Sequence, residues 1–227
     1  CHSSAVYSDD KSLDLDEGRA KKIVDFIMAS PSKTIAIEFN GGETLLAFSI
    51  IKDIVLYAIN KNKELNKQLN FQLPTNLSLL DENMLKFILK YKLKLTTSLD
   101  GHELIHNKNR KAHDPGNYEK TIKNLMFLKE HGVKIGVLPV VTKNSFIFYK
   151  EIIDEYVNLN IQTIHLKPLM NIGYAKKEWE KIGYSIEEFI KYWAMSMDYI
   201  FELAKREIWL IESMVLIILK KIFMPYD

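Results

Sequence analysis

The sequence predicts an α/β protein with a parallel β-sheet. Short strand patterns alternate with amphipathic helical patterns along most of the chain. Each helical stretch is long enough to carry the chain back to the starting edge of a sheet, so successive strands pair in parallel through right-handed crossovers. The 227 residues, 47% hydrophobic and 26% charged, suit one substantial globular core. Ligands of such folds bind at the carboxyl ends of the strands, whether the sheet is open or closed into a barrel.

The first predicted elements are a helix, a strand and a second helix. Residues 15–29 carry apolar side chains at helical spacing, and the pattern stops where Pro31 pushes the preceding residue out of the helical conformation. Apolar residues then alternate over 34–40, which predicts a strand. A helix follows over 45–60, because its apolar residues fall on one face.

The same alternation continues to residue 206. Further strands are predicted at 70–75, 93–99, 133–141 and 162–168, and further helices at 81–91, 118–131, 146–159 and 186–206. A last apolar segment, 208–223, is shorter than the ~20 residues of a membrane span and contains Glu212 and Lys220. We therefore expect it to be a helix that faces the core.

Composition narrows the class of partner. The 31 Lys and Arg residues are scattered and nearly balance the 29 Asp and Glu residues, which argues against nucleic-acid and membrane partners. A small molecule or a peptide is the expected partner. The single cysteine, Cys1, excludes an internal disulfide framework and suits the cytoplasm. A chain that starts at Cys1 without methionine is expected to lack its true beginning.

Polar residues and glycines follow the predicted strands. The stretches are "NGGE" at 40–43, "PTN" at 74–76, "SLDG" at 98–101, "VVTK" at 140–143 and "KPLMN" at 167–171. Each one by itself is common turn chemistry, and Gly41-Gly42 could serve only as a turn. Because parallel strands end at one edge of a sheet, these stretches together predict a site there.

Other polar and aromatic residues carry less functional meaning. The histidines show no metal-ligand spacing and are interpreted as surface, turn or satisfied core residues: His102, His106, His113, His131 and His165. An aromatic and apolar stripe in 186–206 is interpreted as core packing and not as a platform for stacking bases, because the chain has no basic patch.

Three of these stretches resemble motifs of the radical S-adenosylmethionine enzymes, in particular their peptide-modifying (SPASM-type) branch, which includes sulfatase maturases and maturases of His-Xaa-Ser peptides. "GGETLL" is similar to GGEPLL, "TNLSLL" to TNGTLL, and "SLDG" with "HNKNR" to SxDG with HDxxR. The resemblance implies a partial (β/α)6 barrel of parallel strands whose first strand is missing. Residues 1–206 would form this barrel, and 207–227 the helical start of a truncated C-terminal extension.

The resemblance also implies a binding site for S-adenosylmethionine. The cofactor residues would be Gly41 and Gly42 beside the methionyl end, Glu43 at its ammonium, Ser98 and Arg110 at its carboxylate, Leu169 at the adenine, and Asn76. Substrate contacts are assigned to Asn40 and Asp100, and no catalytic residue is assigned. Bare glycine backbone permits close approach, a buried ammonium needs an acceptor, and a guanidinium suits a carboxylate.

A [4Fe-4S] cluster is the second implied cofactor. The family binds it through CxxxCxxC, and "CHSSA" is similar to the third cysteine and its successors, so Cys1 is the predicted metal ligand. One thiolate does not replace three, and this chain by itself is expected to be inactive. The resemblance further implies a peptide or protein substrate and an electron donor such as flavodoxin or ferredoxin.

Two other functions fit the same pattern. An α/β-barrel lyase or hydrolase could use Glu43 and Asp100 as acid and base at the strand ends. A non-catalytic barrel remnant could bind a peptide without changing it.

Overall fold

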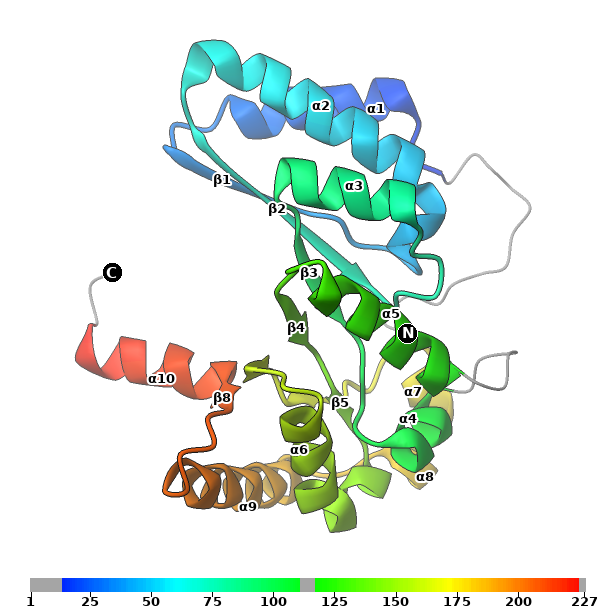
Figure 1. Cartoon of the computed structure of the whole chain (residues 1–227), viewed down its shortest axis with the longest axis vertical. Helices are drawn as coiled ribbons and strands as arrows, with labels where there is room; N and C mark the ends of the chain where they lie inside the picture. The colour runs from blue at the N-terminus through cyan, green and yellow to red at the C-terminus, as the bar shows by residue number, and fades with distance from the viewer. Residues whose placement is uncertain (1–13, 111–116, 225–227) are drawn as a thin grey trace.

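The computed structural model describes residues 14–110 and 117–224, and it contains a curved sheet of parallel strands (Figure 1). The strands of the main sheet pair in the order β1-β2-β3-β4-β6-β8. Their bounds are Thr34–Glu38, Gln68–Thr75, Lys94–Thr97, Ile135–Val137, Thr163–Ile164 and Ile211–Glu212. A second parallel pair consists of β5, Val140–Val141, and β7, Lys167–Pro168.

The strand order runs with the sequence and does not reverse. Each strand of the main sheet pairs in parallel with the one before it, from β1 to β8. An open doubly wound sheet reverses its strand order at a switch point, whereas a barrel does not. The predicted parallel α/β class is therefore confirmed, and its winding is that of a barrel. Within the described residues β1 and β8 do not pair, so this barrel is partial.

Helices connect the strands. The α-helices are α1 Glu17–Met28, α2 Phe48–Leu65, α3 Glu82–Tyr91, α4 Glu103–Asn109, α5 Asn117–Glu130, α6 Tyr149–Asn158, α7 Gly173–Lys177, α8 Trp179–Ile182, α9 Ile186–Ala204 and α10 Ser213–Phe223, and the 3-10 turns are η2 Thr44–Ala47 and η3 Lys143–Phe148. Side-chain caps set several starts: Asp16 accepts from the Arg19 N–H, and Asp81 from the Met84 N–H. Such caps satisfy amide groups that the first helical turn leaves without partners.

The core lies between the sheet and these helices. Ile35 and Ile37 of β1 are buried and alternate with exposed residues, which is the period-2 pattern of a strand with one covered face. Helices contribute one face each, such as Val55 and Ala58 of α2. Tyr156 of α6 is fully buried, and its hydroxyl donates to the Leu99 carbonyl at 2.7 Å. This bond satisfies the polar atom of a large core residue.

Two long predicted strands are each divided in the structure. The predicted strand 133–141 forms β4 and β5, and 162–168 forms β6 and β7. Pro139 lies between β4 and β5 and has no N–H to donate, although its carbonyl accepts from the Lys167 N–H at 2.9 Å. The ladder is therefore interrupted there and resumes as a separate pair.

The segment after residue 206 differs most from the prediction. Ile211–Glu212 forms β8, a strand too short to show alternation, and the predicted helix begins only at Ser213. The prediction that this helix faces the core is wrong, because α10 has no buried residue. In Figure 1 it extends beyond β8 at the margin of the molecule, away from the helices that cover the sheet. None of the described helices combines the length and the apolar character needed to cross a bilayer.

Gly101 occupies a backbone conformation that favours glycine. It follows Asp100 after β3 with φ +111°, and a Cβ added there would lie 2.6 Å from the Ile152 side chain of α6. Gly132, after α5, also has a positive φ of +73°, but no atom lies within 4 Å of its added Cβ. Both glycines therefore have a positive φ, but only Gly101 lacks space for a Cβ.

We expect Gly101→Ala to lower the free energy of unfolding by about 2 kcal/mol or more, since left-handed strain and overpacking add together. Gly132→Ala is the matched control and should cost about 1 kcal/mol, from strain alone. Urea unfolding of both variants measures the difference. Equal losses would show that Ile152 moves aside without cost.

Candidate functional site

The predicted site residues lie at the carboxyl edge of the sheet. Gly41 and Gly42 follow β1, Asn76 follows β2, Ser98 follows β3, and Leu169 follows β7. Because β1, β2 and β3 pair in parallel, their ends share one edge, and β7 pairs in parallel with β5 in the second sheet. Cys1 lies outside the described residues.

Glu43 joins the ends of β1 and β2. Its Oε1 accepts from the Leu45 N–H at 3.0 Å and from the Thr75 hydroxyl at 2.5 Å, and its Oε2 accepts from the Asn76 N–H at 2.8 Å. A carboxylate offers about four acceptor positions, so about one remains for a ligand. The structure thus shows that Glu43 connects two strand ends, a role that the sequence did not indicate. Its predicted contact with an ammonium stays a prediction.

The backbone beside Glu43 is open. Gly41 and Gly42 are exposed, neither has a positive φ, and no atom lies within 4 Å of a Cβ added to either one. A turn that needs φ > 0 therefore does not explain these glycines. Their remaining physical consequence is bare backbone that a ligand can approach closely.

Asp100 and Arg110 form a partly buried ion pair. The Nε and Nη2 atoms of Arg110 each lie 2.9 Å from one carboxylate oxygen of Asp100. Asp100 Oδ1 also accepts from the Val140 N–H at 2.9 Å, and the Asp100 side chain is only 2% exposed. Its predicted substrate contact stays a prediction, but the geometry makes it the residue that positions Arg110. The guanidinium has five N–H groups, so some are left for an anion.

A buried histidine supports this ion pair. His106 Nδ1 accepts from the Asp100 N–H at 3.3 Å, and its Nε2 lies 3.3 Å from Asn117 Nδ2. Burial lowers the pKa of His106 to about 4, and the charge of Arg110 acts in the same direction against that of Asp100. The ring is therefore neutral at pH 7 and is a core histidine whose Nδ1 is satisfied by the Asp100 N–H.

Two of the predicted contact residues have polar side chains that form no hydrogen bond with a described residue. The half-buried Ser98 hydroxyl has no hydrogen-bond partner among the described residues, and neither has the exposed Asn40 side chain. The neighbouring Thr97 hydroxyl is buried and also lacks a partner. Both hydroxyls at the end of β3 can therefore still donate or accept a hydrogen bond.

A tyrosine that sequence reasoning missed fixes the last loop. The Leu169 N–H donates to the Tyr184 hydroxyl at 2.6 Å, and this hydroxyl donates to the Val141 carbonyl at 2.8 Å. Burial raises the pKa of Tyr184 to about 12. Tyr184 thus joins the ends of β5 and β7 and sets the place of the half-buried Leu169. No local pattern marks it, since it lies between two helices far along the chain. Thr75 was missed as well, although it belongs to the quoted "PTN".

Sequence comparisons find relatives over much of the chain. An uncharacterized protein of Methanocaldococcus jannaschii is 27% identical over 197 residues, 84% of this chain and 66% of the relative. The radical SAM cyclopropyl synthase TigE of Paramaledivibacter caminithermalis is 24% identical over 69% of this chain and 32% of its own. A cysteine-type anaerobic sulfatase-maturating enzyme of Clostridium perfringens is 32% identical over 47% of this chain and 29% of its own. No protein-family model matches.

A solved structure shares the fold. The native anSMEcpe structure with bound AdoMet and Kp18Cys peptide superposes with a TM-score of 0.84 at 20% identity, covering 93% of this chain and 59% of that one. These likenesses show the fold of this solved structure and a sequence similarity to radical S-adenosylmethionine enzymes. The chain spans less than two thirds of the length of each protein named here.

The pKa of His106 makes the stability of this radical S-adenosylmethionine fold depend on pH. Its folded pKa of about 4 lies below the ordinary 6.5, so the unfolded chain binds the proton more tightly. The stabilisation from a neutral His106 is complete above about pH 6.5 and is lost as the pH falls towards 4. We expect this residue to contribute about 2 kcal/mol less at pH 5 than at pH 7.

Urea unfolding at both pH values measures the effect, and His106→Asn supplies the comparison, because its amide oxygen can still accept from the Asp100 N–H. The pH-dependent loss should be about 2 kcal/mol smaller in this variant. An equal loss in both proteins would mean that other groups titrate.

Proposed function

We propose that the chain is the S-adenosylmethionine-binding part of a radical enzyme that modifies a peptide or protein. The observation that carries the proposal is the open backbone at Gly41-Gly42, beside the carboxylate of Glu43. The partnerless Ser98 hydroxyl and the spare N–H groups of Arg110 support it from the end of β3. The anSMEcpe structure, which has this fold, contains both AdoMet and a peptide.

The residues of the edge fit the polar end of S-adenosylmethionine. We infer that the methionyl group lies against the two glycines, with its ammonium at the free acceptor position of Glu43. Its carboxylate would take hydrogen bonds from Ser98 and Arg110, and Leu169 would pack on the adenine. Charge-assisted bonds of this kind favour the anionic and cationic ends in their charged forms.

The chemistry of the family comes from the cofactor. When bound, a [4Fe-4S] cluster together with S-adenosylmethionine would supply radical chemistry that can abstract a hydrogen atom from a substrate. The chain's own share is to bind, orient and exclude water. One cysteine, Cys1, does not fit a [4Fe-4S] cluster that needs three thiolates here, so we derive no step through it. A flavodoxin or ferredoxin as electron donor, and an extension beginning at 207, belong to the same proposal.

The geometry does not favour the lyase or hydrolase alternative. Asp100 is buried and paired with Arg110, and Glu43 accepts three hydrogen bonds. A general acid or base must reach a substrate proton with a free oxygen. Glu43 keeps about one free position, but Asp100 is buried and paired, so the two carboxylates are not placed as an acid and base pair.

The glycine surface makes a direct test. Gly42→Ala should leave the free energy of unfolding unchanged or slightly raised, because its φ is not positive and its Cβ meets open space. It should lower the affinity for S-adenosylmethionine about tenfold or more, which is ~1.4 kcal/mol, by filling the surface on which the cofactor lies. Equilibrium dialysis and urea unfolding of the same samples measure both quantities.

Gly132→Ala is the matched control, because it adds the same methyl group at a glycine between α5 and β4, away from the carboxyl edge. It should lower stability and leave affinity unchanged, the reverse of Gly42→Ala. Normal affinity in Gly42→Ala would remove the glycines from the cofactor site.

Arg110 is tested by removing the carboxylate from the ligand. The wild-type chain should prefer S-adenosylmethionine to its decarboxylated analogue by about 1.5 to 3 kcal/mol, the strength of hydrogen bonds to a charged group. Arg110→Gln should reduce this preference, and Arg19→Gln on α1 should keep it.

The ratio of the two affinities is measured on folded protein, so it stays informative if Arg110→Gln is less stable. Arg110→Lys keeps the charge that pairs with Asp100 and gives a second reading. An unchanged preference in both Arg110 variants would assign the carboxylate to other residues.

A further inference from the structure

A groove separates α2 from α3 on the outer surface of the barrel. It has a volume of about 540 Å³, and its apolar lining includes Phe48, Leu56, Phe87 and Tyr91. Phe48 and Phe87 meet edge to face with ring centroids 5.6 Å apart, and Phe87 lies 4.4 Å from Tyr91. The groove therefore has an aromatic floor built from both helices. Exposed apolar grooves of this kind often mark interaction sites.

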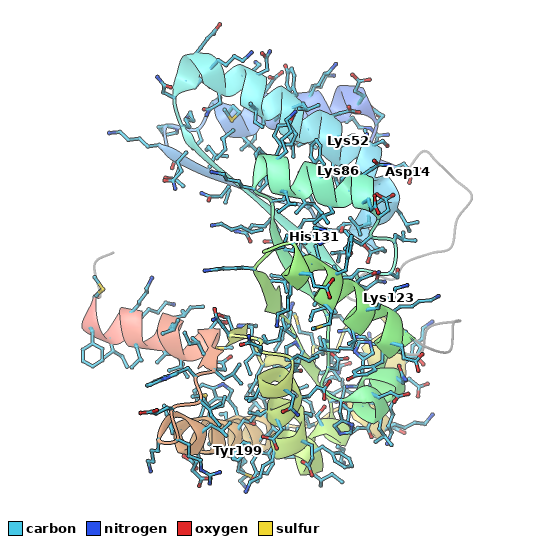
Figure 2. The ribbon with its side chains drawn as sticks, viewed as in Figure 1. Asp14, Lys52, Lys86, Lys123, His131 and Tyr199 are labelled. Carbon is cyan, nitrogen blue, oxygen red and sulfur yellow. The ribbon has the colours of Figure 1, made fainter. Side chains whose placement is uncertain are left out.

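Three lysines line the same groove. Lys52 comes from α2, and Lys86 and Lys90 come from α3. All three side chains are exposed, and Figure 2 labels Lys52 and Lys86 on these neighbouring helices. None of the three forms an ion pair with a described residue. The rim of the groove is therefore positive and unneutralised.

The nearby acids do not cancel this charge. Asp81 lines the groove, but its Oδ1 accepts from the Met84 N–H at 2.7 Å as the cap of α3. Glu82 lies one turn before Lys86, and no ion pair joins them. Lys86 and Lys90 lie four residues apart on one helix, a spacing at which like charges repel. An anionic partner in the groove would relieve that repulsion.

We propose that the α2–α3 groove binds an acidic amphipathic helix of a polypeptide partner. Phe48, Lys52 and Leu56 recur every four residues along α2, so they form one ridge about 12 Å long, or two helical turns. A partner helix would set its apolar face on the aromatic floor and its carboxylates against the lysines. This is the helix-in-groove mode of peptide recognition. The proposal stands apart from the cofactor site, because it uses none of that site's residues.

The apolar floor favours a helix over an anionic bilayer. The lysines flank a floor that includes Phe48, Phe87 and Tyr91, and lipid headgroups have no apolar face to set on these rings. The chain's net charge of +2 also gives little attraction to an anionic membrane at long range. A polypeptide that enters the groove can use both the charges and the apolar floor.

The test uses the 227-residue chain and a fluorescein-labelled synthetic helix with Leu and Phe on one face and Glu on the other. Fluorescence anisotropy should show binding that weakens with added salt. The double variant Lys52→Glu/Lys86→Glu should bind at least about tenfold more weakly, which is ~1.4 kcal/mol. A synthetic helix with Lys in place of Glu should show the opposite preference between the two proteins. Circular dichroism checks that the variant is folded.

Two controls make the result specific to the groove. Lys123→Glu changes an exposed lysine of α5, which Figure 2 labels apart from Lys52 and Lys86, and should bind as the wild type does. A scrambled peptide of the same composition should bind poorly. The proposal is overturned if Lys123→Glu and the double variant lose affinity equally, or if the scrambled peptide binds as tightly. Binding to phosphatidylserine vesicles that the double variant abolishes, without peptide binding, would also overturn it.

Discussion

The buried carboxylate of Asp100 holds the carboxyl edge of the sheet together. It follows β3, pairs with Arg110 after α4, and accepts the N–H of Val140 at the start of β5. Taking a carboxylate out of water costs several kcal/mol unless it is paired and hydrogen-bonded. Because Asp100 is almost fully covered, the three segments must meet where its oxygens are satisfied. The position of Arg110, the main cation of the candidate site, follows from this requirement.

A second carboxylate does the same at the neighbouring strand ends. Glu43 accepts from groups that follow both β1 and β2, and Thr44 adds a bond from its hydroxyl to the Pro74 carbonyl at 2.5 Å. Glu43 and Asp100, which the sequence suggested as binding or catalytic groups, therefore mainly connect neighbouring strand ends through hydrogen bonds. What remains for a ligand is bare backbone, about one acceptor position of Glu43, a hydroxyl and a guanidinium. Such a surface suits a ligand that carries a carboxylate and needs close backbone approach.

At one position where the sequence differs from the TNGTLL motif, a backbone strain is offset by the burial of a side chain. Leu77 stands where TNGTLL has glycine, and its φ of +65° is strained for a residue with a side chain by about 1 to 2 kcal/mol. The side chain is fully buried, which contributes about 1.5 to 3 kcal/mol for a leucine. The Thr75 hydroxyl and the Asn124 amide also hold its backbone. The fold can thus keep the left-handed turn without the glycine.

The sequence by itself determined the elements with strong periodicity and the edge where the site lies. Helices such as α3 and strands such as β1 follow from apolar spacing, and parallel pairing puts their polar successors together. Only the tertiary structure decided the strand order and the partners of each side chain. The two-residue β8 shows no period, and the bond between Asp100 and Val140 joins residues 40 apart, so no local pattern could reveal either one. Local spacing records which face a residue covers, whereas the burial of a charge selects partners across the whole chain.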